Sequence, residues 1–399
     1  MRILHTSDWH LGKYLESFSR LDEQKLFLNE LNDIVEQHKV ELILIAGDIY
    51  DTPNPPANAE QLFFENVKKL SNFGKRPVII IAGNHDGSSR LTAPTPLATP
   101  QGIIVFGTQN CIIPKGEFEH FSIVDSGQGF IELSLNGQNV VISVVPYPSE
   151  KRLNELLPST TDENELQKSY SGKVKYLFDS LSSKYRDDTI NIAMSHLYIV
   201  GGETSKSERD ISIGGSYAVY ADALPKKAQY IAMGHLHKAQ KVIGHKHAFY
   251  SGSPIQYSKN ESNHSKYVYI VDVLCGEEPV INRIQLKKNK PIIVIRADSV
   301  ENALDLCEKH KDESSYIYLE IYTDRVILQD EIKKMRTLKN DIVEILPIFA
   351  EDDEATEKSF EEEKTINEQF VDFYFENKNT FPTEEILELF LELVEEASK

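Results

Sequence analysis

The sequence predicts an α/β fold on two observations, its short apolar runs and the helical periodicity between them. Short continuous apolar runs, such as residues 42–46 and 78–82, alternate with stretches of helical periodicity. Apolar runs of this length are typical of strands in a parallel sheet that is covered on both faces. The chain has 399 residues, of which 40% are hydrophobic and 26% charged. This composition leaves room for two or three globular domains and excludes a wholly disordered protein.

The first 90 residues alternate between predicted strands and helices. Strands are expected at residues 2–5, 40–46 and 78–82, and Ser19 is expected to cap a helix that ends near residue 37. A second helix is expected to open at Pro55 and Pro56 and to stop at Gly74. Proline is tolerated in the first turn of a helix, and glycine commonly follows the last.

The rest of the first domain shows the same strand signal with less regularity. Strands are expected at residues 140–145, 191–194, 230–233 and 267–273, and a polar helical stretch at 149–187. A turn at residues 276–279 marks the end of this domain. The predicted domain boundaries are therefore 1–275, 276–350 and 351–399.

The two remaining segments have different characters. Strands at 291–296, 316–322 and 342–349, separated by helices at 299–309 and 327–338, predict a small two-layer α/β domain. Residues 351–399 hold 17 acidic and 4 basic residues and are expected to form an acidic linker and a helix pair. The second of these helices is apolar on more than one face, so it either packs back on the chain or binds a partner.

The charge balance excludes some classes of protein. A net charge of −19 argues against a nonspecific polybasic protein, but it allows a local phosphate-binding surface. Residues 223–290 run against the trend, with 11 basic and 4 acidic residues. No apolar run approaches the roughly 18 residues of a membrane span, so no membrane association is expected. Three scattered cysteines form no disulfide or metal-binding pattern, and a cytoplasmic location is expected.

Polar residues of one chemical kind follow five of the predicted strands. They are Asp8 and His10, then Asp48, then Asn84 and His85, then His196, and finally His235 and His237. Because the carboxyl ends of strands in an open α/β sheet line one rim, these residues are expected to converge. Carboxylate, amide and imidazole groups are metal ligands. Seven ligands with four imidazoles exceed what one ion needs, so the set predicts two metal ions with a bridging carboxylate. His85 is left over and suits a proton donor to a leaving oxygen.

Each part of this set has a purely structural explanation. Asp-x-His and Gly-Asp are common at the turns that follow strands, and a single buried histidine usually has a structural role. The joint occurrence of five such elements after apolar runs favours the metal site. His245 and His247 repeat the spacing of His235 and His237 without a preceding apolar run, so they are expected to lie in a solvated turn. Asp51 and Asp86 are predicted either to orient imidazoles or to cap turns, and the sequence leaves both open.

These motifs resemble those of a known enzyme family. Asp8-x-His10, Gly47-Asp48-x-x-Asp51, Gly83-Asn84-His85-Asp86, His196 and Gly234-His235-x-His237 resemble the five motifs of calcineurin-like metallophosphoesterases. The longer stretches at residues 7–12, 46–51, 81–86, 207–209, 234–237 and 250–254 resemble the SbcD family of bacterial nuclease subunits. The resemblance covers about residues 1–275. It implies a metallophosphoesterase domain of packed mixed sheets flanked by helices, a capping α/β domain and a C-terminal helix pair.

The resemblance also implies how the ligands divide. One divalent ion would be held by Asp8, His10, Asp48 and His237, and the other by Asp48, Asn84, His196 and His235. Asp48 would bridge the two ions, which are expected to be manganese, while His85 would assist the transition state or leaving group. The mixed nitrogen and oxygen ligands also fit iron and do not exclude zinc.

The implied activity is manganese-dependent DNA exonuclease and endonuclease chemistry. The partners would be DNA and an SbcC-type ATPase bound by the C-terminal helices, with a homodimer inside a heterotetramer that acts in DNA repair, recombination and replication. Candidate contacts to the DNA backbone are Lys226, Lys227, Lys238, Lys241, Lys287, Lys288 and Lys290. Two other hypotheses stay open: a calcineurin-like phosphatase or phosphodiesterase that acts on small phosphoesters or phosphoproteins, and a non-catalytic scaffold with a relic metal site.

Overall fold

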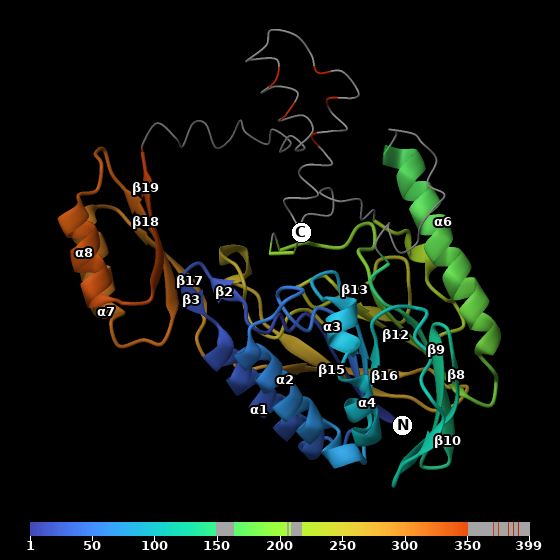
Figure 1. Cartoon of the computed structure of the whole chain (residues 1–399). Coiled ribbons are helices and arrows are strands. Elements are labelled where there is room, and N and C mark those ends of the chain that lie inside the picture. The colour runs from blue at the N-terminus through green and yellow to red at the C-terminus, as the bar shows by residue number, and fades with distance from the viewer. Residues whose placement is uncertain are drawn as a thin grey trace.

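The computed structural model describes residues 1–148, 163–205, 207–208 and 218–349, together with Phe370, Tyr374, Pro382, Ile386 and Phe390. Four layers make up most of the molecule: helices, a six-stranded sheet, an eight-stranded sheet and one long helix (Figure 1). A smaller sheet with two helices stands beside them. No helix in the described part of the chain is long and apolar enough to cross a membrane.

The six-stranded sheet has the order β16-β15-β1-β4-β5-β6. Its parallel strands are β1 (Arg2–Thr6), β4 (Leu42–Ala46), β5 (Val78–Ile81) and β6 (Ile103–Phe106), and the antiparallel edge is β15 (Tyr267–Asp272) and β16 (Val280–Gln285). All five residues of β4 are buried. This agrees with the prediction of continuous apolar strands covered on both faces.

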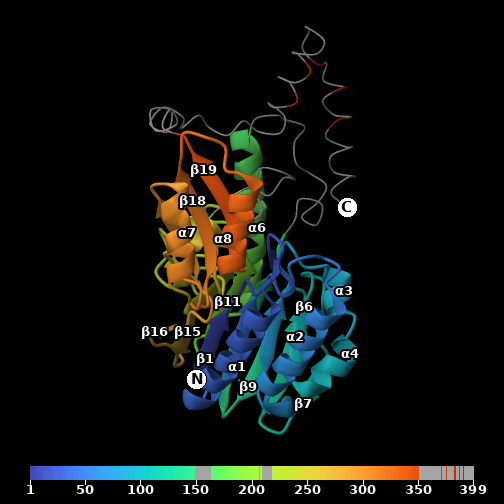
Figure 2. The same cartoon turned by 90° about the vertical axis from the view of Figure 1, so that its left-hand side faces the viewer.

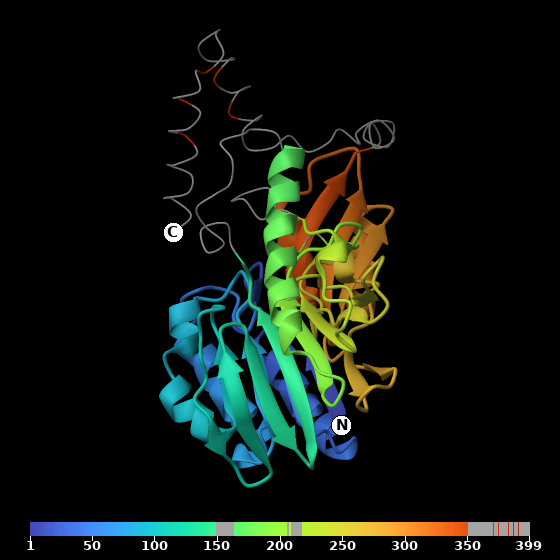
Figure 3. The ribbon, with the colours of Figure 1, turned by 90° about the vertical axis from the view of Figure 1, so that its right-hand side faces the viewer.

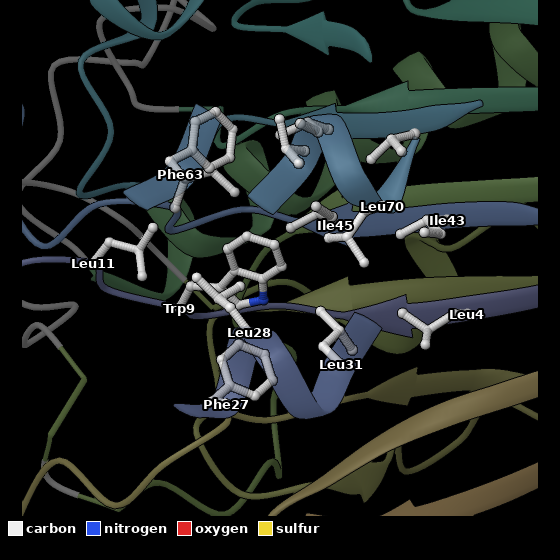
Figure 4. Close-up of a cluster of buried hydrophobic side chains, with 14 of the residues drawn as sticks. Leu4, Trp9, Leu11, Phe27, Leu28, Leu31, Ile43, Ile45, Phe63 and Leu70 are labelled. Carbon is white, nitrogen blue, oxygen red and sulfur yellow. The ribbon is translucent and has the colours of Figure 1, made fainter. Parts of the chain in front are cut away.

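Helices cover one face of this sheet. They are α1 (Leu21–Gln37), α2 (Ala57–Leu70), α3 (Ser88–Thr92) and α4 (Thr95–Ala98). The core between them includes Leu4, Phe27, Ile45 and Phe63 (Figure 4). Here burial of apolar side chains, worth about 25 cal/mol per Å² of apolar area, is the main stabilising term.

Two predicted helix ends differ from the structure. Ser19 lies in a short strand one residue before the N-cap position, which Arg20 occupies without a side-chain cap. The Ser19 hydroxyl still accepts from the backbone N–H of Leu21, the first residue of α1, at 3.4 Å. The Arg20 guanidinium is buried and instead pairs with Glu23 in the first helical turn. The second helix ends at Leu70 rather than Gly74, because a short 3-10 turn, η1 (Asn72–Gly74), follows it.

The eight-stranded sheet covers the other face of the first. Its order is β13-β14-β12-β11-β10-β9-β8-β7. The strands are β7 (Gly116–Glu117), β8 (Phe121–Gly127), β9 (Phe130–Leu135), β10 (Gln138–Val145), β11 (Ile190–His196), β12 (Tyr230–Gly234), β13 (Gln240–Lys241) and β14 (Ala248–Tyr250). Strands β10, β11, β12 and β14 run parallel to one another, so both large sheets are mixed.

A long helix, α6 (Glu163–Leu181), packs on the outer face of the second sheet (Figure 3). The helix predicted to reach residue 187 ends at Leu181, where a short 3-10 turn, η3 (Ser182–Lys184), follows. Residues 149–162 of the prediction lie outside the described part. The first sheet is covered by helices on one face and by a second sheet on the other, which places the ends of strands from both sheets in contact.

The predicted α/β unit after residue 276 has its own sheet, of order β17-β18-β19. Parallel strands β17 (Ile292–Ala297), β18 (Tyr316–Tyr322) and β19 (Ile342–Ile348) alternate with α7 (Val300–Lys309) and α8 (Gln329–Leu338) (Figure 2). The Ser299 hydroxyl caps α7 by accepting from the backbone N–H of Asn302. We call this unit the capping module.

The capping module rests on a small hairpin of the first domain. The hairpin consists of β2 (Tyr14–Leu15) and β3 (Phe18–Ser19). Leu15 and Phe18 pack against Ile292, Tyr316 and Val343 of the module. Most of the predicted C-terminal linker and helix pair lies outside the described residues, but the rings of Phe370 and Phe390 stack with centroids 3.8 Å apart.

Candidate metal centre

All eight site residues predicted from the sequence lie together where strands of the two large sheets end. Asp8 and His10 follow β1, Asp48 follows β4, and Asn84 and His85 follow β5, while His196 ends β11 and His235 and His237 follow β12. Six of the seven predicted ligands are buried, and Asn84 is half-buried. The convergence that we expected at strand ends is confirmed, although the rim belongs to two sheets rather than one.

The backbone of these loops is unusual. Asp8, His10, Asp48 and His235 have φ angles of 54°, 45°, 49° and 107°. Side chains other than glycine rarely adopt positive φ, and each such residue costs on the order of 1–3 kcal/mol. Backbone strain of this kind clusters at functional sites, and here it occurs at four of the seven predicted ligands.

Trp9 anchors the loop that carries Asp8 and His10. Its ring points away from the site into the core between α1 and α2, edge-on to Phe27 and Phe63 at centroid distances of 5.8 and 6.3 Å (Figure 4). The indole N–H donates to the Thr6 hydroxyl at 3.0 Å. Packing of this large ring fixes the position of the two ligand candidates on either side of it.

Asp48 lies between two groups of ligands. Its Oδ2 atom is 3.3 Å from His196 Nε2 and 3.6 Å from His10 Nε2. Ligand atoms of Asp8, Asp48 and His196 all lie within 4.8 Å of one another, and the same holds for Asp8, His10 and His237. This is the placement expected of a carboxylate that bridges two ions.

Nitrogen and oxygen atoms face one another at short range on both sides of Asp48. On one side, His10 Nε2 and His237 Nε2 are 3.0 Å apart. On the other, Asn84 Oδ1 lies 3.0 Å from both His196 Nε2 and His235 Nδ1. Lone pairs that converge in this way need either a hydrogen atom or a metal ion between them.

The rear nitrogens of two of the imidazoles lie close to acceptors of the protein. His196 Nδ1 donates to the Ala46 carbonyl at 2.8 Å, and His10 Nδ1 lies 3.3 Å from Asp51 Oδ1. Metal-binding histidines commonly hydrogen-bond through the second nitrogen, which directs the lone pair of the first toward the ion. Asp51 is thus close enough to His10 to orient its imidazole, which is one of the two roles predicted for it.

The pKa values of the buried carboxyl and imidazole groups are shifted, as is common where charged groups gather in a metal site. Burial raises the pKa of Asp8 to about 6. Burial acts in the same direction on Asp48, but His196, His85 and His10 outweigh it and hold the pKa of Asp48 well below its usual range. Burial would lower the pKa of His196, yet Asp48 raises it to about 9. Within the described part of the chain, His235 Nε2 is buried without a hydrogen-bond partner.

His85 stands at the edge of this cluster. Its backbone N–H donates to Asp48 Oδ1 at 2.8 Å, and its Nδ1 donates to the Asp51 carbonyl at 2.7 Å. The ring lies edge-on to His10 with centroids 4.6 Å apart. The remaining nitrogen, Nε2, is thereby available to exchange a proton with a bound molecule.

Asp86 has the second of its predicted roles, that of a turn cap. Oδ2 accepts from the backbone N–H groups of Ile49 and Gly83 at 3.1 and 2.9 Å, and Oδ1 accepts from Tyr50 at 3.0 Å. These bonds join the loop after β4 to the loop after β5. A Cβ on Gly83 would lie 2.1 Å from Asp48 Oδ1, so glycine is required for the close approach of the two loops.

Comparison with known proteins agrees with this geometry. The family model "Calcineurin-like phosphoesterase" matches residues 1–239, and "Type 5 capsule protein repressor C-terminal domain" matches residues 288–378. The SbcD component of nuclease SbcCD from Bacillus subtilis (strain 168) is 40% identical over 396 residues, which cover 98% of this chain and 97% of that protein. The chain belongs to the SbcD family of calcineurin-like phosphoesterases.

More distant relatives extend the comparison. The protein of the same name from Escherichia coli (strain K12) is 32% identical over 355 residues, covering 87% of this chain and 84% of that protein. Among solved structures, a dimetal phosphatase from Danio rerio aligns with 72% of this chain and 97% of its own, at 12% identity and a TM-score of 0.41, too distant to add to the assignment. The calcineurin-like family implies divalent metal ions and phosphoesterase activity, and the ligand clusters described above fit both.

Sequence reasoning missed the residues behind His237. Its Nδ1 is 2.6 Å from the Ser207 hydroxyl, which donates to the buried carboxylate of Glu261 at 2.5 Å. Lys266, also buried, donates to the same carboxylate and to the His237 carbonyl. The stretch 207–209 was recognised as part of the family resemblance, but no pattern tied it to Glu261.

The predicted basic contacts are dispersed over the SbcD-family fold. Lys226 and Lys227 line a pocket beside Asn191 and Gln229, where β11 and β12 begin, so they lie at the opposite end of these strands from the metal centre. Lys287, Lys288 and Lys290 line a pocket at the base of the capping module. His247 pairs with Glu278 at 2.7 Å in a turn before β14, as expected of a turn outside the site.

Proposed function

We propose that this protein is the nuclease component of an SbcCD-type complex, a manganese-dependent DNA exonuclease and endonuclease that hydrolyses phosphodiester bonds by two-metal catalysis. The observation that carries the proposal is the position of Asp48 Oδ2 between His196 Nε2 and His10 Nε2, at 3.3 and 3.6 Å. A shared carboxylate oxygen supports a pair of ions. The relatives that are named as components of nuclease SbcCD support DNA as the substrate.

The ligands divide into two sets around Asp48. We assign one ion to Asp8, His10, Asp48 and His237, and the other to Asp48, Asn84, His196 and His235. The mixed nitrogen and oxygen donors suit manganese. Two divalent ions in such a site activate water at neutral pH and neutralise charge on a phosphate.

The chain's own residues prepare this chemistry. Asp51 and the Ala46 carbonyl orient the imidazoles of His10 and His196 through their rear nitrogens. His85 Nδ1 is occupied by the Asp51 carbonyl, so His85 Nε2 is the atom that hands a proton to the leaving oxygen. A positioned proton donor of this kind contributes about 10²–10⁴-fold to a rate.

We further propose that the C-terminal segment binds an SbcC-type ATPase. Its acidic helices, predicted from the sequence, have an apolar stripe, and the second family match extends to residue 378. On the same family membership we propose a homodimer within a heterotetramer that acts in DNA end processing, recombination, replication and repair. The cytoplasmic location stays a prediction.

Labelled linear DNA tests the activity. With Mn²⁺, the wild-type protein should cleave DNA and Asp48→Ala should not. His85→Ala should keep its bound metal and cleave about 10²–10⁴-fold more slowly. Cleavage of small phosphoesters or phosphoproteins but not of DNA would overturn the nuclease and favour a phosphatase. Absence of any hydrolysis with metal bound would favour a scaffold.

Truncation tests the partner. A chain that lacks residues 360–399 should fail to retain SbcC in a pull-down while it still binds manganese. Retention of SbcC by the truncated chain would refute the docking role of this segment.

A further inference from the structure

A fully buried carboxylate lies behind the metal centre. Glu261 belongs to a short 3-10 turn, η5 (Lys259–Glu261), and its side chain has no exposed area. Oε1 accepts from the Ser207 hydroxyl at 2.5 Å and from the Tyr257 backbone N–H at 3.2 Å, while Oε2 accepts from Lys266 Nζ. Removing a charge from water is costly unless it is paired and hydrogen-bonded, and here both oxygens are satisfied.

This carboxylate sets the direction of a hydrogen-bond chain. Because an ionised carboxylate only accepts, the Ser207 hydroxyl donates to Glu261 and must accept from His237 Nδ1, 2.6 Å away. His237 therefore carries its proton on Nδ1. Its Nε2 lone pair then faces His10 Nε2 at 3.0 Å, in the position of a metal ligand.

The backbone of His237 is held by the same group of residues. Its N–H donates to Glu208 Oε1 at 2.8 Å, and its carbonyl accepts from Lys266 Nζ at 3.1 Å. In this structure His237 is thus fixed at three points by residues that do not themselves reach the metal centre.

The turn that carries Glu261 also touches the capping module. Lys259 Nζ lies 2.7 Å from Glu320 Oε1 in β18. Gln256 bridges the two units, because its Nε2 donates to the Glu261 carbonyl at 2.7 Å and its Oε1 accepts from the Ile292 backbone N–H at 2.8 Å. A displacement of the capping module would therefore move η5.

We propose that Ser207 and Glu261 are positioning residues that orient His237, and that docking of the capping module onto η5 sets the affinity for the metal ion on the His237 side. This inference rests on the proposed two-ion site. It predicts that the two ions differ: the ion that His237 holds depends on the module, and the ion that Asn84 and His235 hold does not.

Calorimetric titration of the metal-free full chain with Mn²⁺ tests the positioning role. Ser207→Ala should weaken one binding step by about 10–100-fold, the usual effect of losing the partner of a ligating histidine, and leave the other step unchanged. Ser207→Thr keeps a hydroxyl and should restore the affinity. Two unchanged steps, or equal weakening of both, in a variant with wild-type circular dichroism would overturn the assignment.

Two residues that pair with the same carboxylate, Glu320, provide a test of whether the capping module affects metal binding through η5. Lys259 and Arg296 both pair with Glu320, at 2.7 and 2.8 Å, but only Lys259 belongs to η5. Lys259→Ala should weaken the same Mn²⁺ step as Ser207→Ala, by a smaller factor, whereas Arg296→Ala should leave both steps as in the wild type. Equal effects of the two variants would overturn the link.

These titrations need no DNA. If the wild-type protein binds two ions in the predicted pattern but cuts no DNA, the proposed nuclease fails and this inference stands. If DNA is cut but the variants do not weaken one Mn²⁺ binding step more than the other, this inference fails and the proposed nuclease stands.

Discussion

The backbone N–H of His85 donates to Oδ1 of Asp48 at 2.8 Å, while Oδ2 of the same carboxylate faces His196 at 3.3 Å. The side chain that we expect to bridge two metal ions therefore also fixes the residue that we expect to supply a proton. The same hydrogen bond, together with those that Asp86 accepts from Ile49, Tyr50 and Gly83, holds the loop after β4 against the loop after β5.

Replacement of His85 should slow chemistry without removing metal. His85→Ala should reduce cleavage of DNA by about 10²–10⁴-fold with Mn²⁺ content unchanged in elemental analysis. The loss should be much smaller with a p-nitrophenyl phosphodiester, because p-nitrophenolate leaves without protonation. An equal loss with both substrates would contradict the role of His85 as proton donor.

Substitution of Asp86 should mainly lower the stability of the protein, whereas substitution of Asp51 should mainly lower its affinity for Mn²⁺. Asp86→Asn replaces one acceptor oxygen by an N–H₂ group and should destabilise the metal-free protein by about 1–3 kcal/mol, read as a fall in melting temperature. Asp51→Asn should lower Mn²⁺ affinity by about 10–100-fold, because Asp51 orients His10, with a smaller effect on melting. Exchanged outcomes for the two variants would contradict the roles that we assign.

His247 provides a matched control for His237. Both belong to a His-x-His pair, but His237 faces His10 Nε2 and His247 pairs with Glu278 outside the site. His237→Ala should bind one Mn²⁺ ion fewer per chain and should no longer cleave DNA. His247→Ala should bind as much Mn²⁺ as the wild type and should still cleave DNA. Loss of metal from His247→Ala would contradict the boundary of the site.

Metal binding should release protons. Asp48 raises the pKa of His196 to about 9 against the effect of burial, so the metal-free imidazole is charged at pH 7 and must lose its proton to bind an ion. Affinity for Mn²⁺ should therefore rise between pH 7 and 9, about tenfold per pH unit for each proton displaced, and then level off. Calorimetry in buffers of different ionisation enthalpy measures the proton count, and an affinity independent of pH over this range would contradict the charge state.

The site was predictable because its signals are local. Each ligand follows a short apolar run, and a parallel β strand delivers whatever follows it to one rim. Ser207 and Glu261 gave no such signal. They are 54 residues apart, and Glu261 lies in a short 3-10 turn within the basic stretch 223–290, whose lysines were considered as contacts to DNA. Only the folded chain shows that Lys266 of this stretch is buried.

The strands of the first sheet and of the capping module, and the helices between them, were predicted from the periodicity of apolar residues. The hairpin of β9 and β10 was missed, although Asn136 and Gly137, with φ angles of 51° and 77°, form the turn between these strands that an Asn-Gly pair favours. Arg20 rather than Ser19 holds the N-cap position of α1, and its buried guanidinium pairs with Glu23, which also accepts from the Tyr316 hydroxyl of the capping module. Such tertiary contacts have no signature in local sequence.

Anomalous diffraction from crystals grown with Mn²⁺ tests the central claim most directly. Two peaks should appear on either side of Asp48 Oδ2, one beside His10 and His237 and the other beside Asn84, His196 and His235. A single peak, or peaks away from Asp48, would contradict a two-ion phosphodiesterase site built on this carboxylate.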